Sequence, residues 1–182
     1  KLNWLILVLP NPELLVKPLL SKESVESSAI ENIYTTTTEL LKSETINKNK
    51  LKWPEKEVTN YKDALLYGFN FIKNNWFIHT NLLVKIWDII EPNKWWIRKI
   101  PGTVIANSFW ETLYTPPVWE TNIRNYLKNL EDFVNNFDDD IDPLIKVWVI
   151  HYQFESIHPF CDWNWRTWRV LMVLYLLILI LS

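Results

Sequence analysis

Five side chains suited to handling a polyphosphate lie within twelve residues near the end of the chain, in the segment HPFCDWNWRTWR (158–169). Arg166 and Arg169 are three residues apart, so on a helix both guanidiniums project from one side and can bind phosphate oxygens. The Asp162 carboxylate is a hard ligand suited to Mg²⁺ that also touches phosphates. Asn164 can donate to a phosphate oxygen, and His158, with an ordinary pKa of about 6.5, can accept a proton from a hydroxyl. This set predicts phosphoryl or nucleotidyl transfer, in which positioning and charge neutralisation contribute most of the catalysis.

The elements around this segment would place its side chains at the start of a helix. Val170–Leu181 is an unbroken apolar run, shorter than the roughly 20 residues that span a bilayer, and it predicts a buried central helix. The unpaired N–H groups at the start of such a helix attract anions, and 163–169 falls there. Leu144–Glu155 is predicted to form the preceding helix, with Asp142 as N-cap and Pro143 at its first position. The loop Ile157–Cys161 would join the two helices.

The rest of the chain is predicted to be helical, with one β-hairpin. Apolar spacing favours helices at about 21–42, at Val58–Lys73 and at His79–Ile90, although the Thr35–Thr38 run is poor helix material. Two short β-favouring runs, 103–105 and 112–114, flank a turn at 108–111. We therefore predict a mostly α bundle with one small β-hairpin, in a single domain covering 1–182.

Composition and charge exclude several classes of protein. The formal net charge of −2 gives no basis for binding nucleic acid through this segment. A single cysteine, Cys161, cannot form an internal disulfide, which favours a reducing, cytoplasmic compartment. The apolar start, Leu2–Leu9, is followed by prolines rather than a cleavage site, so we expect neither a signal peptide nor a membrane segment. Because the chain starts with Lys and stops directly after the apolar run, we expect the protein to continue beyond both ends.

The segment 158–169 resembles the signature of the Fic family, His-x-Phe-x-(Asp/Glu)-Gly-Asn-Gly-Arg-x-x-Arg. The segments 151–158 (HYQFESIH), 97–102 (IRKIPG) and 114–117 (YTPP) are also similar to segments typical of that family, so the resemblance runs from about residue 9 to the end. It implies a Fic-type helical bundle with a flap at about 97–117 and a motif loop and helix at 158–181. The implied reaction is protein adenylylation (AMPylation), in which a nucleotidyltransferase moves AMP from ATP to a Tyr, Thr or Ser hydroxyl of a protein.

The resemblance also implies a role for each site residue. His158 would be the general base and Asp162 the magnesium ligand. The ATP phosphates would be bound by residues of the loop and the helix start, namely Trp163, Asn164, Trp165, Arg166 and Arg169. In the flap, a target segment would add as a strand beside Thr103, Val104, Ile105, Thr112, Leu113 and Tyr114. The implied cofactors are ATP and Mg²⁺, and the implied partner is a protein substrate. Self-modification and a homodimer are left open.

An inhibitory element is implied near the N-terminus. Ser27-Ser-Ala-Ile-Glu31-Asn32 resembles the inhibitory motif (Ser/Thr)-x-x-x-Glu-(Gly/Asn), which precedes the core in one subclass of the family. Ser27 and Glu31 are four residues apart and would share a helix face. In such proteins the glutamate pairs with the second motif arginine, here Arg169, and denies it to the γ-phosphate of ATP. The resemblance therefore implies autoinhibition by an N-terminal helix at about 21–42.

The chain departs from the family pattern at both glycines, where it carries Trp163 and Trp165. It has 2 Gly and 12 Trp in total, and their sum is close to the glycine count expected for this length, about 13. Indole rings at these two positions would obstruct the approach of phosphate to the loop backbone. One alternative is a catalytically inactive Fic-like module that binds a protein partner. A second is a Fic enzyme that transfers a different phosphate-containing group. A third is that glycine occupies these positions in the protein made by the cell, which leaves the enzyme intact.

Overall fold

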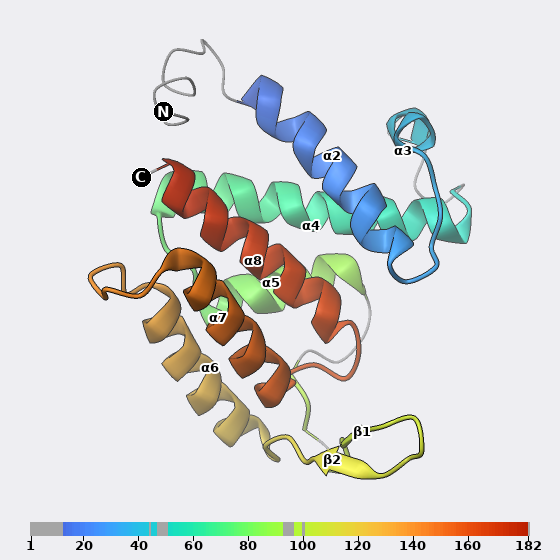
Figure 1. Cartoon of the computed structure of the whole chain (residues 1–182). Helices are drawn as coiled ribbons and strands as arrows, with labels where there is room; N and C mark the ends of the chain where they lie inside the picture. Colours follow the sequence, from blue (N-terminus) through green and yellow to red (C-terminus); the bar gives the residue numbers. More distant parts are fainter. Residues whose placement is uncertain (1–12, 44, 47–50, 93–96, 100, 182) are drawn as a thin grey trace.

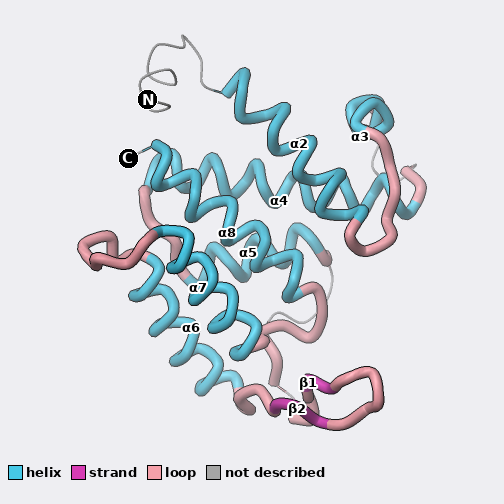
Figure 2. The backbone as a smooth tube through the Cα atoms, viewed as in Figure 1, coloured by secondary structure: helices cyan, strands magenta, loops and turns pink. Residues whose placement is uncertain are grey.

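The protein is a helical bundle with one small hairpin at its edge (Figure 1, Figure 2). The computed structural model describes residues 13–43, 45–46, 51–92, 97–99 and 101–181. The apolar start of the chain therefore lies outside the described residues. The elements are α2 (Glu13–Ala29), α3 (Thr37–Ser43), α4 (Trp53–Asn75), α5 (Thr80–Ile90), β1 (Ile105–Ala106), β2 (Thr112–Tyr114), α6 (Glu120–Val134), α7 (Pro143–Ile157) and α8 (Asn164–Leu181). The predicted fold class, mostly α with a hairpin, is confirmed.

Helix α8 is the central element, as the apolar run predicts. It packs against α4, α5 and α7, and Val170, Leu171 and Leu174 on it are at most 1% exposed. Gly68 of α4 allows a close approach to α8, because a Cβ there would lie 2.6 Å from Leu174 Cδ1. None of the helices in the described ranges is long and apolar enough to cross a membrane.

The N-terminal helix expected at about 21–42 is two helices. α2 ends at Ala29, and the turn after it contains Asn32 at φ 59°, a left-handed conformation that stops the helix. α3 starts after Thr36, whose hydroxyl accepts from Glu39 N, while Thr36 N donates to the Glu39 carboxylate. This reciprocal capping box sets a new helix start inside the threonine run. The prediction of one helix was wrong because these local caps override the apolar spacing.

Helix α7 begins where its sequence predicts. Asp142 is the N-cap, its Oδ1 accepts from Leu144 N at 2.8 Å, and Pro143 is the first helical residue. Helix α6, which the sequence analysis did not identify, lies beside α7. Its buried residues, Ile123, Leu127, Leu130 and Val134, have the spacing of a single helix face.

The second strand of the hairpin coincides with its β-favouring run, 112–114, whereas the first is shorter than predicted and lies later in the chain. β1 pairs antiparallel with β2, with Ile105 opposite Tyr114 and a bulge after Ile105. Thr103 and Val104, which were predicted to lie in the first strand, precede it. Asn107 organises the turn, because its Oδ1 accepts from Phe109 N and Glu111 N, both at 3.0 Å. The hairpin surface is apolar and exposed at Val104, Leu113 and Tyr114.

Tryptophan occupies several left-handed backbone positions. Among the described non-glycine residues, six have positive φ, and four of these are Trp76, Trp110, Trp119 and Trp163, with φ between 54° and 74°. A Cβ atom makes this conformation unfavourable by about 1–2 kcal/mol per residue. Glycine has no such cost.

Candidate active site

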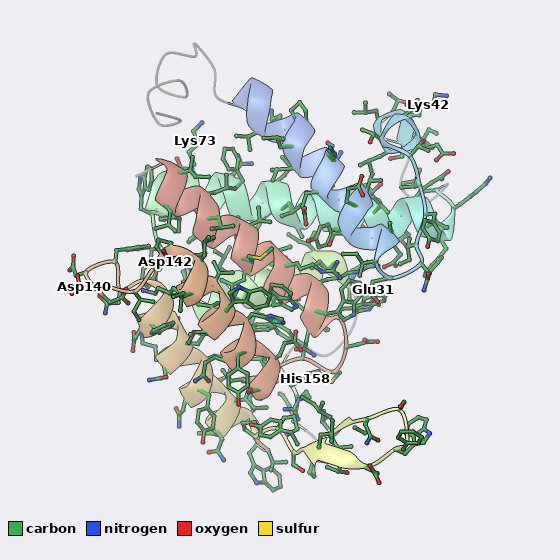
Figure 3. The ribbon with its side chains drawn as sticks, in the orientation of Figure 1. Glu31, Lys42, Lys73, Asp140, Asp142 and His158 are labelled. Carbon is green, nitrogen blue, oxygen red and sulfur yellow. The ribbon has the colours of Figure 1, made fainter. Side chains whose placement is uncertain are left out.

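The site lies at the N-terminal end of α8, where the loop from α7 enters. His158 ends α7 with φ 46° and ψ 60°, and its N–H donates to Phe154 O at 2.9 Å, which closes the helix. Its imidazole is 24% exposed, and Nδ1 lies 3.7 Å from Glu155 Oε2. Figure 3 places His158 and Glu31 at this end of α8, with Asp140 and Asp142 at the opposite end of α7.

The loop between His158 and α8 is held by Asn164 and Trp87. Asn164 is 2% exposed, and its amide bonds both backbone groups of Phe160: Oδ1 accepts from Phe160 N at 2.9 Å and Nδ2 donates to Phe160 O at 2.8 Å. The buried Trp87 stacks on Phe160 at 5.1 Å, and its Nε1 donates to Asp162 O. Asn164 thus shapes the loop, a role that differs from the predicted donation to phosphate, which stays a prediction.

Arg166 is fully buried and only partly satisfied. Its Nη1 donates to Glu57 Oε2 at 2.9 Å, whereas Nε and Nη2 are buried with no hydrogen-bond partner in the described part of the chain. Burial lowers the pKa of Arg166 and raises the pKa of the Glu57 carboxyl, because a low-dielectric environment disfavours both charged forms. The unpartnered Nε and Nη2 of this buried guanidinium carry a desolvation cost that an anion beside them would offset.

Arg169, one helical turn further on, is engaged by the segment around Glu31. Its Nη1 donates to the backbone carbonyl of Ser27 at 2.8 Å, and its Nη2 donates to Glu31 Oε1 at 3.2 Å. The predicted contact between Glu31 and Arg169 is therefore present. Glu31 lies in the turn after α2, so it does not share a helix face with Ser27, and Ser27 contributes its carbonyl rather than its hydroxyl.

Two indole rings cover the arginines. The Arg166 guanidinium carbon lies 4.1 Å from the Trp163 ring centroid and 4.9 Å from that of Trp165, and Arg169 lies 4.3 Å from Trp165. These cation–π contacts satisfy part of the buried charge.

The donors present fit a nucleotide and a magnesium ion in type. Asp162 is exposed, and its Oδ1 accepts from Trp163 N. Among the residues that the structure describes, no group of three or more His, Cys, Asp or Glu could hold a metal ion. One carboxylate is consistent with Mg²⁺, which usually keeps several waters and is shared with substrate phosphates.

The hairpin is joined to the site through Arg98. The guanidinium of Arg98 donates to His158 O and to Pro117 O, at the C-terminal root of the hairpin. The structure thus brings the predicted motif residues, Ser27 and Glu31 to one end of α8, with the predicted flap beside it (Figure 1).

Sequence reasoning missed three residues that hold the site, namely Glu57, Trp87 and Arg98. Glu57 is separated from Arg166 by 109 residues, and Arg98 from His158 by 60. Arg98 lay inside the family-like segment 97–102, which is the signal that could have identified it. For Glu57 and Trp87, helical spacing alone gives no such signal.

Comparison with known proteins assigns the chain to a family. The family model "Fic/DOC family" matches residues 78–176, and "Fic/DOC family N-terminal" matches residues 1–70. The chain belongs to the Fic/DOC family. Among solved structures, a Fic-domain-containing signaling protein from Bacteroides thetaiotaomicron superposes with a TM-score of 0.72 at 18% identity, covering 97% of this chain and 70% of that one. At this identity the likeness shows the Fic fold. The N-terminal match agrees with the Fic subclass whose inhibitory segment precedes the core, and membership of the family indicates a Fic-type function for the chain.

Proposed function

We propose that this Fic protein is an adenylyltransferase that moves AMP from ATP to a hydroxyl side chain of a protein. The observation that supports this most directly is Arg166, whose Nε and Nη2 are buried without a partner beside the N-terminus of α8. A guanidinium at a helix start is a donor set for phosphate oxygens. Arg169 Nη2, once released from Glu31, adds a second donor one turn away.

The reaction follows from the roles of the side chains. The hydroxyl oxygen of the target attacks the α-phosphorus of ATP, the bond from that phosphorus to the bridging oxygen of the β-phosphate breaks, and pyrophosphate leaves. His158 accepts the hydroxyl proton. Arg166 and Arg169 neutralise phosphate charge, and Asn164 maintains the loop around them. Asp162 would hold Mg²⁺, which when bound adds positive charge at the phosphates.

The target would be positioned by the flap. β1 and β2 offer backbone groups and an exposed apolar surface, so an extended segment could add to them as a strand with its hydroxyl near His158. A segment of a second copy of this chain would fit the same description, which is the basis for self-modification.

Glu31 would keep the enzyme inactive. Its carboxylate already holds Arg169 Nη2, and a carboxylate and a phosphate compete for the same guanidinium geometry. The inhibited state would end when the turn after α2 moves away from α8.

An inactive binding module is the second candidate, and the rings of Trp163 and Trp165 over Arg166 favour it. In that case the flap would bind a partner without any dependence on ATP.

The decisive experiment uses ATP labelled at either the α- or the γ-phosphate, with Mg²⁺ and the Glu31→Gly protein. AMP transfer attaches the α-label and releases the γ-label with pyrophosphate. Attachment of the γ-label would instead identify phosphate transfer. Absence of both adducts, together with absence of ATP binding by calorimetry, would leave the binding module as the function.

A further inference from the structure

Arg98 connects the loop that carries His158 to the root of the hairpin. The residue is 3% exposed and lies between α5 and β1. Its Nε donates to His158 O at 2.5 Å, and its Nη2 donates to Ile157 O at 3.2 Å and to Pro117 O at 3.0 Å. One side chain therefore binds three carbonyl groups from two segments.

The backbone beside Arg98 reinforces the same connection. Arg98 N donates to Pro159 O at 2.9 Å, and Ile97 forms an antiparallel bridge with Phe160. Residues 97–98 thus run alongside the motif loop and are joined to it by one isolated antiparallel bridge. Because α8 starts only four residues after Phe160, this bridge holds the segment that leads into the flap next to the loop.

The conformation of His158 gives this arrangement its significance. The last carbonyls of α7, including those of Ile157 and His158, have no hydrogen-bond partners within the helix. A cationic side chain at the C-terminus of a helix stabilises such carbonyls by donating hydrogen bonds to them and by offsetting their partial negative charge. His158 has φ 46°, a sparsely populated conformation that persists only where surrounding contacts determine it. The Arg98 guanidinium supplies such a contact at the carbonyl of His158 itself.

Pro117 supplies the link to the flap. It lies three residues after β2, whereas Arg98 lies a few residues before β1. Both roots of the hairpin therefore meet at one guanidinium, which also holds His158. A displacement of Pro117 relative to the loop must therefore alter the hydrogen bonds of Arg98.

We propose that Arg98 is a positioning residue that fixes the His158 imidazole relative to the flap, so that a target docked on the hairpin presents its hydroxyl to the base. This inference rests on the proposed transfer. Arg98 contacts neither nucleotide nor target. It acts through the backbone of His158 and Pro117.

The kinetic experiment compares Arg98→Lys with Lys99→Ala in the Glu31→Gly background. Lysine keeps the charge but cannot reach three carbonyls at once, and a displacement of about 1 Å at a reacting group costs roughly 100-fold in rate. We expect kcat for adduct formation to fall about 100-fold while the Kd for ATP stays within twofold. Lys99, exposed and paired with Glu120 at 3.3 Å, is the matched neighbour, and Lys99→Ala should leave both constants within twofold. An unchanged kcat in folded Arg98→Lys would overturn the proposal, as would a parallel loss of ATP affinity, which indicates general loosening.

A second measurement requires no activity. The chain has three histidines, so the ring-proton resonance of His158 can be assigned by its loss in His158→Ala. Ile105→Pro, which disrupts the hairpin ladder, should shift that resonance in the parent protein but not in Arg98→Lys. If Arg98→Lys does not fold, the comparison of the parent protein with Ile105→Pro decides. A His158 resonance at the same position in these two proteins overturns the proposal. A further outcome separates the two proposals. If no AMP adduct forms in Glu31→Gly, but Ile105→Pro still shifts the His158 resonance only when Arg98 is present, the proposed reaction fails and the positioning role of Arg98 stands.

Discussion

Replacing Glu31 by glycine should release Arg169 and strengthen ATP binding about tenfold. The Glu31 side chain is 33% exposed and that of Arg169 is 9% exposed, so their contact at 3.2 Å is neither fully solvated nor fully buried. Hydrogen bonds to charged groups contribute about 1.5–3 kcal/mol, and partial solvation favours the lower end. About 1.4 kcal/mol corresponds to a factor of ten in an equilibrium. A nucleotide that must displace Glu31 binds more weakly by that factor.

Calorimetric titration with ATP and Mg²⁺ measures this effect directly, and labelled adduct reports the rate. Because Glu31 competes with phosphate, the rate should rise about tenfold at low ATP, and the gain should shrink as ATP saturates the site. Glu31→Gln removes the charge and keeps an acceptor oxygen, so its affinity should fall between those of the parent and Glu31→Gly.

Asn32→Gly is the matched control. It places a glycine in the same turn at φ 59°, where glycine is tolerated, and it leaves the Glu31 carboxylate in place. Equal ATP affinities of Glu31→Gly and the parent would refute the competition. An equal gain in Asn32→Gly would attribute the effect to turn flexibility.

Three further predictions concern the base, the loop and a helix cap. His158→Ala should abolish AMP transfer while the Kd for ATP stays within twofold; transfer that persists in a radiolabel assay would remove His158 as the base. Trp163→Gly should uncover Arg166 and strengthen ATP binding. Trp76→Gly, which removes a Cβ atom at a similar φ of 54° elsewhere, should leave ATP binding unchanged. Equal Kd values for ATP in the two variants, measured by calorimetry, would contradict this prediction. Hydrogen bonds from Thr36 hold the pKa of Glu39 below 4.5, so its contribution to stability is present above pH 4.5 and lost as pH falls through the lower folded value. In urea unfolding, the free energy of unfolding of Glu39→Gln should lack this decrease at low pH. If the free energies of unfolding of Glu39→Gln and the parent change in parallel with pH, Glu39 does not stabilise the cap.

The bundle and its motif helix could be predicted because their signals are local. The apolar run from Val170 and the Asp142-Pro143 start each depend on neighbouring residues, and both are present as expected. The break after α2 was missed because the apolar spacing continues through it. The left-handed backbone at Asn32 ends one helix, and the capping box between Thr36 and Glu39 starts another. The early start of α4, at Trp53, was missed because the segment 47–57 is polar and lysine-rich, which is typical of an exposed connection.

The positions of the side chains within the site could be predicted only where a family motif names them. The Glu31 contact with Arg169 follows from the motif, although the two residues are 138 positions apart. Glu57 and Trp87 have no motif, and their function depends on which helix faces pack together around α8. Asn164 illustrates the remaining difficulty, because an amide suited to phosphate is equally suited to the backbone of Phe160.

The four tryptophans with positive φ bear on the stability of the fold. At 76, 110, 119 and 163 the backbone has the conformation that glycine prefers, so tryptophan at each position costs the folded state about 1–2 kcal/mol of conformational free energy that glycine would not. Peptide masses across 157–169 would show which of the two residues a given preparation carries at 163.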